Sequence, residues 1–208
     1  MTSCSSHPGP LETDAGQTQS GAFLMGMSEP SADPIAIHLA AIRDLFDASE
    51  SRGMPLWLES GWAIDARLGR VTRQHDDIDV AFPKHREDEY RELIESIGYR
   101  GHEFLDYGFL SWRGQVCIDS EPCHVVRGGY SFEGFPAGSC PADKEGVILG
   151  FPIRCVSWEA LYFEMLGYVQ DIPEAQWRPK DFESRRIIEA NLEERTKRVI
   201  KDLHTRRA

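Results

Sequence analysis

The chain lacks any long apolar run: no stretch reaches the roughly 18 residues that a membrane-spanning helix needs. Its first twenty residues also lack the basic and apolar regions of a secretion signal. We therefore expect no membrane association and predict a cytoplasmic protein.

Positively charged residues are also scarce: the sequence has 23 Lys and Arg against 34 Asp and Glu, for a net charge of −11. This balance repels phosphate backbones, so we expect no nucleic acid partner, whereas a small cationic ligand would be attracted.

A recognisable zinc site is also missing. Cys117, Cys123 and His124 lie near one another in the sequence, but their spacing matches no common zinc-ligand pattern. Residues 1–32 are rich in Ser, Gly, Pro and Thr without an apolar period, which predicts a disordered tail. The remaining length can bury one substantial core, or one core with a small helical unit attached.

From residue 33 onward the apolar spacing predicts alternating helices and strands. Asp33-Pro34 is typical of a helix start, and Ser157 of another. The expected helices cover residues 33–53, 60–68, 86–97, 157–169 and 179–204, and the expected strands cover residues 56–58, 78–82, 107–112, 116–120 and a hairpin at 147–156. A long loop is expected at residues 127–146. This order predicts an α+β domain at residues 33–156, followed by a helical C-terminal domain at residues 157–208.

Two carboxylates open the strand at residues 78–82. Asp77 and Asp79 are separated by one apolar residue, and alternate side chains of a strand share a face, so the two carboxylates project together. Such a pair is costly unless a cation lies between them, and hard oxygen ligands of this kind suit Mg²⁺. The alternative is that both are simply solvent-facing residues of an edge strand.

A third acid, Asp119, ends the expected strand at residues 116–120. If this strand pairs beside the first, three carboxylates converge and can hold two metal ions, an arrangement that assists in-line phosphoryl displacement. Upstream, Ser60-Gly61 lies where a strand meets a helix N-terminus, so its backbone N–H groups can receive phosphate oxygens. A small-residue turn before an acidic strand is the layout of polymerase-β-type nucleotidyltransferases.

Longer stretches extend this likeness. The sequence resembles the aminoglycoside 2''-O-nucleotidyltransferases and, less closely, the lincosamide nucleotidyltransferases, over roughly residues 54–186. The resemblance implies a nucleotidyltransferase fold, with a small mixed β-sheet flanked by helices and a helical C-terminal part. The matching segments include PLW at 55–57, GWAIDARLGRVTR at 61–73, HDDID at 75–79, LDYGFL at 105–110, GSCP at 138–141 and SWEA at 157–160.

The resemblance also assigns roles to individual residues. Asp77, Asp79 and Asp119 match the metal-binding acids, and Asp119 matches the general base acting on the acceptor hydroxyl. Further matches are nucleotide-binding positions at Ser60, Gly61, Arg73 and Lys180, and acceptor-binding positions at Asp106, Glu121 and Glu164. For Arg73, Lys180, Glu121 and Glu164, ordinary surface charge remains the alternative.

Two segments depart from the family pattern. The family shows consecutive glycines before its Trp, whereas this chain has Glu59-Ser60-Gly61-Trp62, which adds side chains and a negative charge to the phosphate turn. The aromatic-rich acceptor segment of the family is replaced here by residues 164–168, EMLGY. These departures concern the phosphate turn and the acceptor segment, and therefore bear on catalytic turnover and on the exact acceptor rather than on the fold.

The sequence thus predicts an antibiotic-resistance transferase that moves a nucleoside monophosphate, AMP from ATP, to a hydroxyl of an aminoglycoside-like acceptor with the help of two Mg²⁺ ions. Two alternatives stay open. One is a nucleotidyltransferase of the same fold that modifies a macromolecule, either protein or tRNA. The other is a catalytically weak nucleotide or aminoglycoside binder, for which Glu59 is the main argument.

Overall fold

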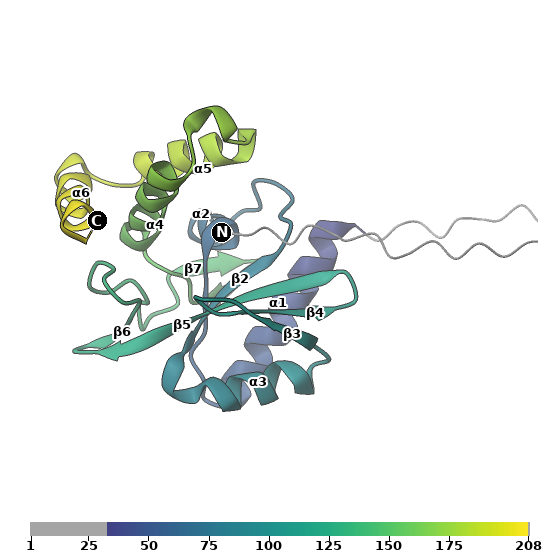
Figure 1. Cartoon of the computed structure of the whole chain (residues 1–208). Coiled ribbons are helices and arrows are strands. Elements are labelled where there is room, and N and C mark those ends of the chain that lie inside the picture. The colour runs from purple at the N-terminus through teal and green to yellow at the C-terminus, as the bar shows by residue number, and fades with distance from the viewer. Residues whose placement is uncertain (1–32, 208) are drawn as a thin grey trace, which may run out of the picture.

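The computed structural model describes residues 33–207; the tail expected at residues 1–32 lies outside them. Figure 1 shows α4 and α5 above the sheet, with α3 and the lower part of α1 below it. None of the described helices is both long and apolar enough to cross a membrane. The described helices are α1 (Pro34–Ser51), α2 (Ser60–Leu68), α3 (Glu87–Ser96), α4 (Trp158–Asp171), α5 (Pro179–Ala190) and α6 (Glu194–Arg207), with 3-10 turns at Lys84–Arg86 and Glu174–Gln176.

The main sheet is mixed. Its strands follow the order β1-β2-β5-β4-β3, with β6 paired to β5, while β7 and β8 form a separate hairpin. The pairing of β2 with β5 is parallel, and the other pairings are antiparallel. The strands are β1 (Trp57–Leu58), β2 (Ile78–Pro83), β3 (Arg100–Phe104), β4 (Phe109–Arg113), β5 (Val116–Val126), β6 (Gly129–Ser131), β7 (Gly146–Ile148) and β8 (Phe151–Ile153).

The strands β2 and β5 lie at the centre of the fold, where the hydrophobic core holds them in place. Ile78 and Val80 of β2 are fully buried, as is Ile118 of β5, so the intervening Asp79 and Asp119 point to the other face. The same hydrophobic core continues into the C-terminal helices through Ile188 of α5 and others. The division into two domains after residue 156 stays a prediction.

Backbone contacts at β1 bring the C-terminal helices close to the acidic strands. The N–H of Leu58 donates to the Arg154 carbonyl at 3.0 Å, and the N–H of Val156 donates back to the Leu58 carbonyl at 2.9 Å. Ser157 directly follows Val156, and its side chain caps α4 by accepting a hydrogen bond of 3.1 Å from the N–H of Ala160. As a result, α4 begins beside β1 and α2.

The structure contradicts two expectations about local structure and contains one strand that the sequence did not predict. The strand β3 was not anticipated, because Arg100–Phe104 is largely exposed and shows no apolar alternation. The loop expected at residues 127–146 contains β6, which extends β5 into a hairpin. The single helix expected at residues 179–204 is two helices that break at Asn191, where no proline or glycine marks the end.

Candidate active site

The parallel pairing of β2 and β5 places Asp79 directly beside Asp119 in register. Asp77 comes just before β2 and contributes a third carboxylate to the same region. Burial raises the pKa of Asp79 well above its usual range, and repulsion from Asp77 and then Asp119 raises it further. The β2–β5 pairing thus brings Asp77, Asp79 and Asp119 to the lining of one cavity, while their role as metal ligands stays a prediction.

Asp119 has an incompletely satisfied carboxyl group. Its Oδ2 accepts a long hydrogen bond of 3.4 Å from the Tyr107 hydroxyl, whereas its buried Oδ1 has no hydrogen-bond partner within residues 33–207. Burial, followed by the charge of Asp77, raises the pKa of Asp119 to about 6. A buried carboxyl oxygen without a partner is costly, so this arrangement favours a bound cation.

The acids fit a divalent cation by their chemistry, although their side chains are not yet in liganding geometry. Carboxylate oxygens are the ligands that Mg²⁺ prefers, and the unpartnered Oδ1 of Asp119 is available as one. In the described part of the chain, however, no three His, Cys, Asp or Glu side chains already converge on one point as metal ligands do. Cation binding would therefore need small side-chain adjustments, and it would lower the raised pKa values of these acids.

Gly108 explains how the turn before β4 reaches the acids. A Cβ at this position would lie 1.9 Å from the carbonyl oxygen of Ser120 on β5, so only glycine permits this close approach. The neighbouring Tyr107 is thereby brought to Asp119. Sequence reasoning did not select Tyr107 as a site residue, although it lies in the LDYGFL segment that carried the resemblance.

The turn at Ser60-Gly61 has the compact backbone expected of a phosphate-receiving loop. Ser60 has a φ of +47°, in the left-handed region that L-residues rarely adopt. A Cβ on Gly61 would lie 2.4 Å from Nδ1 of His75 and 2.8 Å from Nη2 of Arg73. Ser60 and Gly61 form the N-terminus of α2 and line the cavity, so the free N–H groups and the dipole of this helix face the cavity.

The left-handed backbone of Ser60 leads to a stability prediction with a built-in control. Ser60→Ala and Ser60→Gly both remove the hydrogen bond of 3.2 Å that the serine hydroxyl donates to Glu164, but only glycine relieves the positive φ. We expect Ser60→Gly to be about 1 kcal/mol more stable than Ser60→Ala. Urea unfolding of the two variants measures this difference, and an equally stable or more stable alanine variant would contradict it.

A buried pair behind the turn holds it in place. His75 Nε2 lies 2.7 Å from Oδ2 of the buried Asp65, and Oδ1 of Asp65 accepts from the Thr72 backbone N–H at 3.1 Å. The His75 ring also packs on Trp62, with ring centroids 4.4 Å apart. His75 therefore acts as a structural hydrogen-bonding residue between α2 and the chain before β2.

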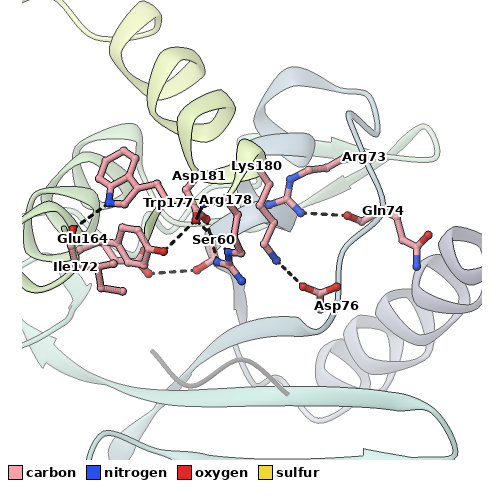
Figure 2. A network of polar contacts seen from close by, with 11 residues as sticks. Ser60, Arg73, Gln74, Asp76, Glu164, Ile172, Trp177, Arg178, Lys180 and Asp181 are labelled. Atoms are coloured by element: carbon pink, nitrogen blue, oxygen red, sulfur yellow. Dashed lines mark hydrogen bonds and ion pairs between the residues drawn. The ribbon is translucent and has the colours of Figure 1, made fainter. Parts of the chain in front are cut away.

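The basic residues of the cavity come from two places: Arg73 precedes β2, and Arg178 and Lys180 lie at the start of α5. Lys180 Nζ is 2.5 Å from Oδ2 of Asp76, and Arg73 donates to the Gln74 carbonyl at 3.1 Å (Figure 2). Arg178 pairs with Asp181 at 2.9 Å in the first turn of α5. Arg73 and Lys180 thus line the same cavity, and their role toward phosphate stays a prediction. Arg178 also lines it and was not anticipated, because its place there depends on how α5 packs.

Acidic residues gather on the α4 side. Burial, and then Glu164, raise the pKa of Glu121 to about 8; burial also raises the pKa of Glu164 to about 7. Glu59 is buried beside them, and burial raises its pKa well above the usual range, with further contributions from Glu121 and Glu164. Asp106 is exposed in the turn before β4 and does not line the cavity with the others.

These elements enclose a cavity of about 370 Å³. Its walls come from the start of α2, the start of β2, the middle of β5, and α4 and α5, so segments about a hundred residues apart face one another, as Ser60 and Glu164 do. Acidic side chains outnumber Lys and Arg in its lining by eight to three: Glu59, Asp76, Asp77, Asp79, Asp119, Glu121, Glu164 and Asp181 against Arg73, Arg178 and Lys180. Such a cavity attracts cations, both metal ions and amines.

Comparison with known proteins shows which family the chain belongs to. The profile of the aminoglycoside-2''-adenylyltransferase family matches residues 41–182. Proteins named 2''-aminoglycoside nucleotidyltransferase from Klebsiella pneumoniae and Escherichia coli are each 45% identical over 151 residues, which cover 73% of this chain and 85% of theirs.

Solved structures show the same relationship. The crystal structure of ANT(2'')-Ia in complex with adenylyl-2''-tobramycin superimposes with a TM-score of 0.79 at 41% identity, covering 83% of this chain and 99% of the other. The lincomycin-bound lincosamide adenylyltransferase LnuA shares the fold alone, with a TM-score of 0.53 at 18% identity, covering 72% of this chain and 97% of the other. The predicted nucleotidyltransferase fold is thereby confirmed, and the chain belongs to the aminoglycoside 2''-adenylyltransferase family.

Proposed function

We propose that this protein transfers AMP from ATP to a hydroxyl of an aminoglycoside, the 2''-hydroxyl by analogy with its relatives. The observation that carries the proposal is the in-register pair Asp79 and Asp119, which lies between a phosphate-receiving turn and an acidic pocket. The relatives are named for transfer to aminoglycosides, and one was solved with the adenylyl-2''-tobramycin product. The cytoplasm, where ATP is available, is the proposed location.

The divalent cations, which we propose to be two Mg²⁺ ions, would be held by Asp77, Asp79 and Asp119. When bound, these ions would neutralise charge on the triphosphate oxygens. The triphosphate would be received by the backbone N–H groups at Ser60 and Gly61.

Arg73 and Lys180 flank this turn and would steady the same phosphate oxygens. Lys180 now pairs with Asp76, so nucleotide binding would exchange a carboxylate partner for phosphate.

Asp119 is the proposed general base. Its carboxylate takes the proton of the acceptor hydroxyl as the new oxygen–phosphorus bond forms at the α-phosphate. The bond to the leaving pyrophosphate breaks in the same displacement, so the products are the adenylylated acceptor and pyrophosphate. Tyr107, which contacts Asp119 at 3.4 Å, would orient the carboxylate for this step.

Glu121 and Glu164 are the proposed acceptor-binding residues, because they lie next to the base and face a polycationic substrate. Asp106 is the weaker candidate, since it lies outside the cavity lining.

Incubating the protein with Mg-ATP and tobramycin, followed by mass spectrometry of the antibiotic, tests the proposed function. A mass gain of one AMP group supports it, whereas an unmodified antibiotic beside an intact protein contradicts it.

Acceptor binding should depend strongly on ionic strength. An acidic cavity that holds a polycation relies on Coulomb attraction, which salt screens over roughly 8 to 10 Å at physiological strength and over about 3 Å at 1 M. We expect the Kd for tobramycin to rise roughly tenfold or more between low and high NaCl, as measured by calorimetry. An affinity independent of salt would contradict this account of the acidic cavity.

A further inference from the structure

The position of Glu59 is set by its backbone. Its N–H donates to the Asp79 carbonyl at 2.9 Å, and its carbonyl accepts the Ala63 N–H at 3.0 Å, so the residue is pinned between β2 and α2. Its side chain makes no capping hydrogen bond to α2. The side chain lines the cavity instead, which means that the fold directs a carboxyl group there.

One oxygen of this carboxyl group lacks a hydrogen-bond partner among the described residues. Glu59 is only 6% exposed, and its buried Oε1 has no hydrogen-bond partner among the described residues. A buried carboxylate in this state costs stability unless something outside the protein compensates for it. The side chain is therefore unfavourable for the empty fold but available to a ligand.

The proposed acceptor-binding acids lie in the same part of the fold as Glu59. Glu121 of β5 and Glu164 of α4 line the cavity together with Glu59, and Glu164 accepts a hydrogen bond of 3.2 Å from Ser60, the residue that follows Glu59. Glu59 therefore adds a third carboxyl group to the acidic lining that Glu121 and Glu164 provide.

We propose that Glu59 is a specificity-determining residue, which forms with Glu121 and Glu164 a three-carboxyl pocket for one ammonium group of the acceptor. The inference rests on the proposed function and deepens it. An ammonium group has three N–H donors and a positive charge, which matches three acceptors drawn from three separate elements. A hydroxyl at the same place would leave buried carboxylates uncompensated, so the pocket should discriminate between amine and hydroxyl.

The test compares wild type with Glu59→Gln, which keeps the shape of the side chain and removes its charge. Calorimetry would use kanamycin-type aminoglycosides in which one amine at a time is replaced by a hydroxyl. We expect Glu59→Gln to bind the parent antibiotic at least about tenfold more weakly. One member of the series should lose affinity for the wild type but not for Glu59→Gln, whereas the exposed Glu92→Gln should behave as wild type.

Two further readouts exclude a merely structural role. Without ligand, Glu59→Gln should melt at the same or a higher temperature than wild type, while its stabilisation by the antibiotic shrinks. The KM for ATP should stay within about twofold of the wild-type value, and Glu59→Asp should retain part of the discrimination. A lower melting temperature together with an equal affinity loss across the series would overturn the proposal.

The remaining outcomes separate this inference from the proposed function. If the wild type binds and adenylylates aminoglycosides but Glu59→Gln retains full affinity across the series, the inference alone fails. If the wild type binds no aminoglycoside, the proposed function fails and the inference falls with it.

Discussion

Asp79→Asn is expected to lower kcat by at least about 10³-fold while leaving the fold intact. Asp79 lies between Asp77 and Asp119, and both of these charges act on it, so it is the carboxylate placed to be shared by two cations. Asparagine retains the shape but loses the charge that a divalent ion requires. The repulsion within the acid group falls at the same time, so the melting temperature should stay equal or rise.

Steady-state kinetics with saturating Mg²⁺, ATP and tobramycin, together with a thermal melt, measure both effects. Asp143→Asn provides the matched control, because Asp143 is an exposed acid outside the cavity lining. Turnover of Asp79→Asn close to that of the wild type would rule out a cation held by these acids.

Asp119→Asn should lower kcat by about 10²- to 10⁴-fold and change KM for the acceptor far less. A general base acts in the transition state, so its loss appears in kcat rather than in ground-state binding. The amide can still accept the hydrogen bond from Tyr107, so the turn before β4 should keep its place.

Full kinetics against tobramycin separate the two parameters. An effect confined to KM would reassign Asp119 to acceptor binding. A Tyr107→Phe variant is a useful companion, because the orienting role proposed for Tyr107 predicts a much smaller loss in kcat.

The acidic strands could be predicted from the sequence because their signal is local. Ile78 and Val80 alternate with Asp77 and Asp79, and this pattern alone assigns the carboxylates to one face. The partner Asp119 needed one assumption, that the two strands pair, and the parallel β2–β5 register confirms it. The glycine preference of the turn was likewise visible, and the φ of Ser60 shows the conformation behind it.

The features that the sequence did not reveal depend on packing between distant segments. Arg178 reaches the cavity because α5 folds back over α2, and nothing local to Arg178 encodes that contact. Asp106 and Tyr107 are neighbours, yet the close approach at Gly108 brings only Tyr107 to the site. The place of Glu59 in the cavity lining follows from its backbone bonds to β2 and α2, which the sequence does not show.

Pyrophosphate release from ATP tests the central claim most directly. The protein is mixed with Mg-ATP, and release is followed after adding tobramycin, kanamycin or tRNA in parallel. The account predicts rapid release with the aminoglycosides, none above background with tRNA, and loss of the signal in Asp79→Asn. Release that depends on tRNA, or no release with any aminoglycoside, would contradict it.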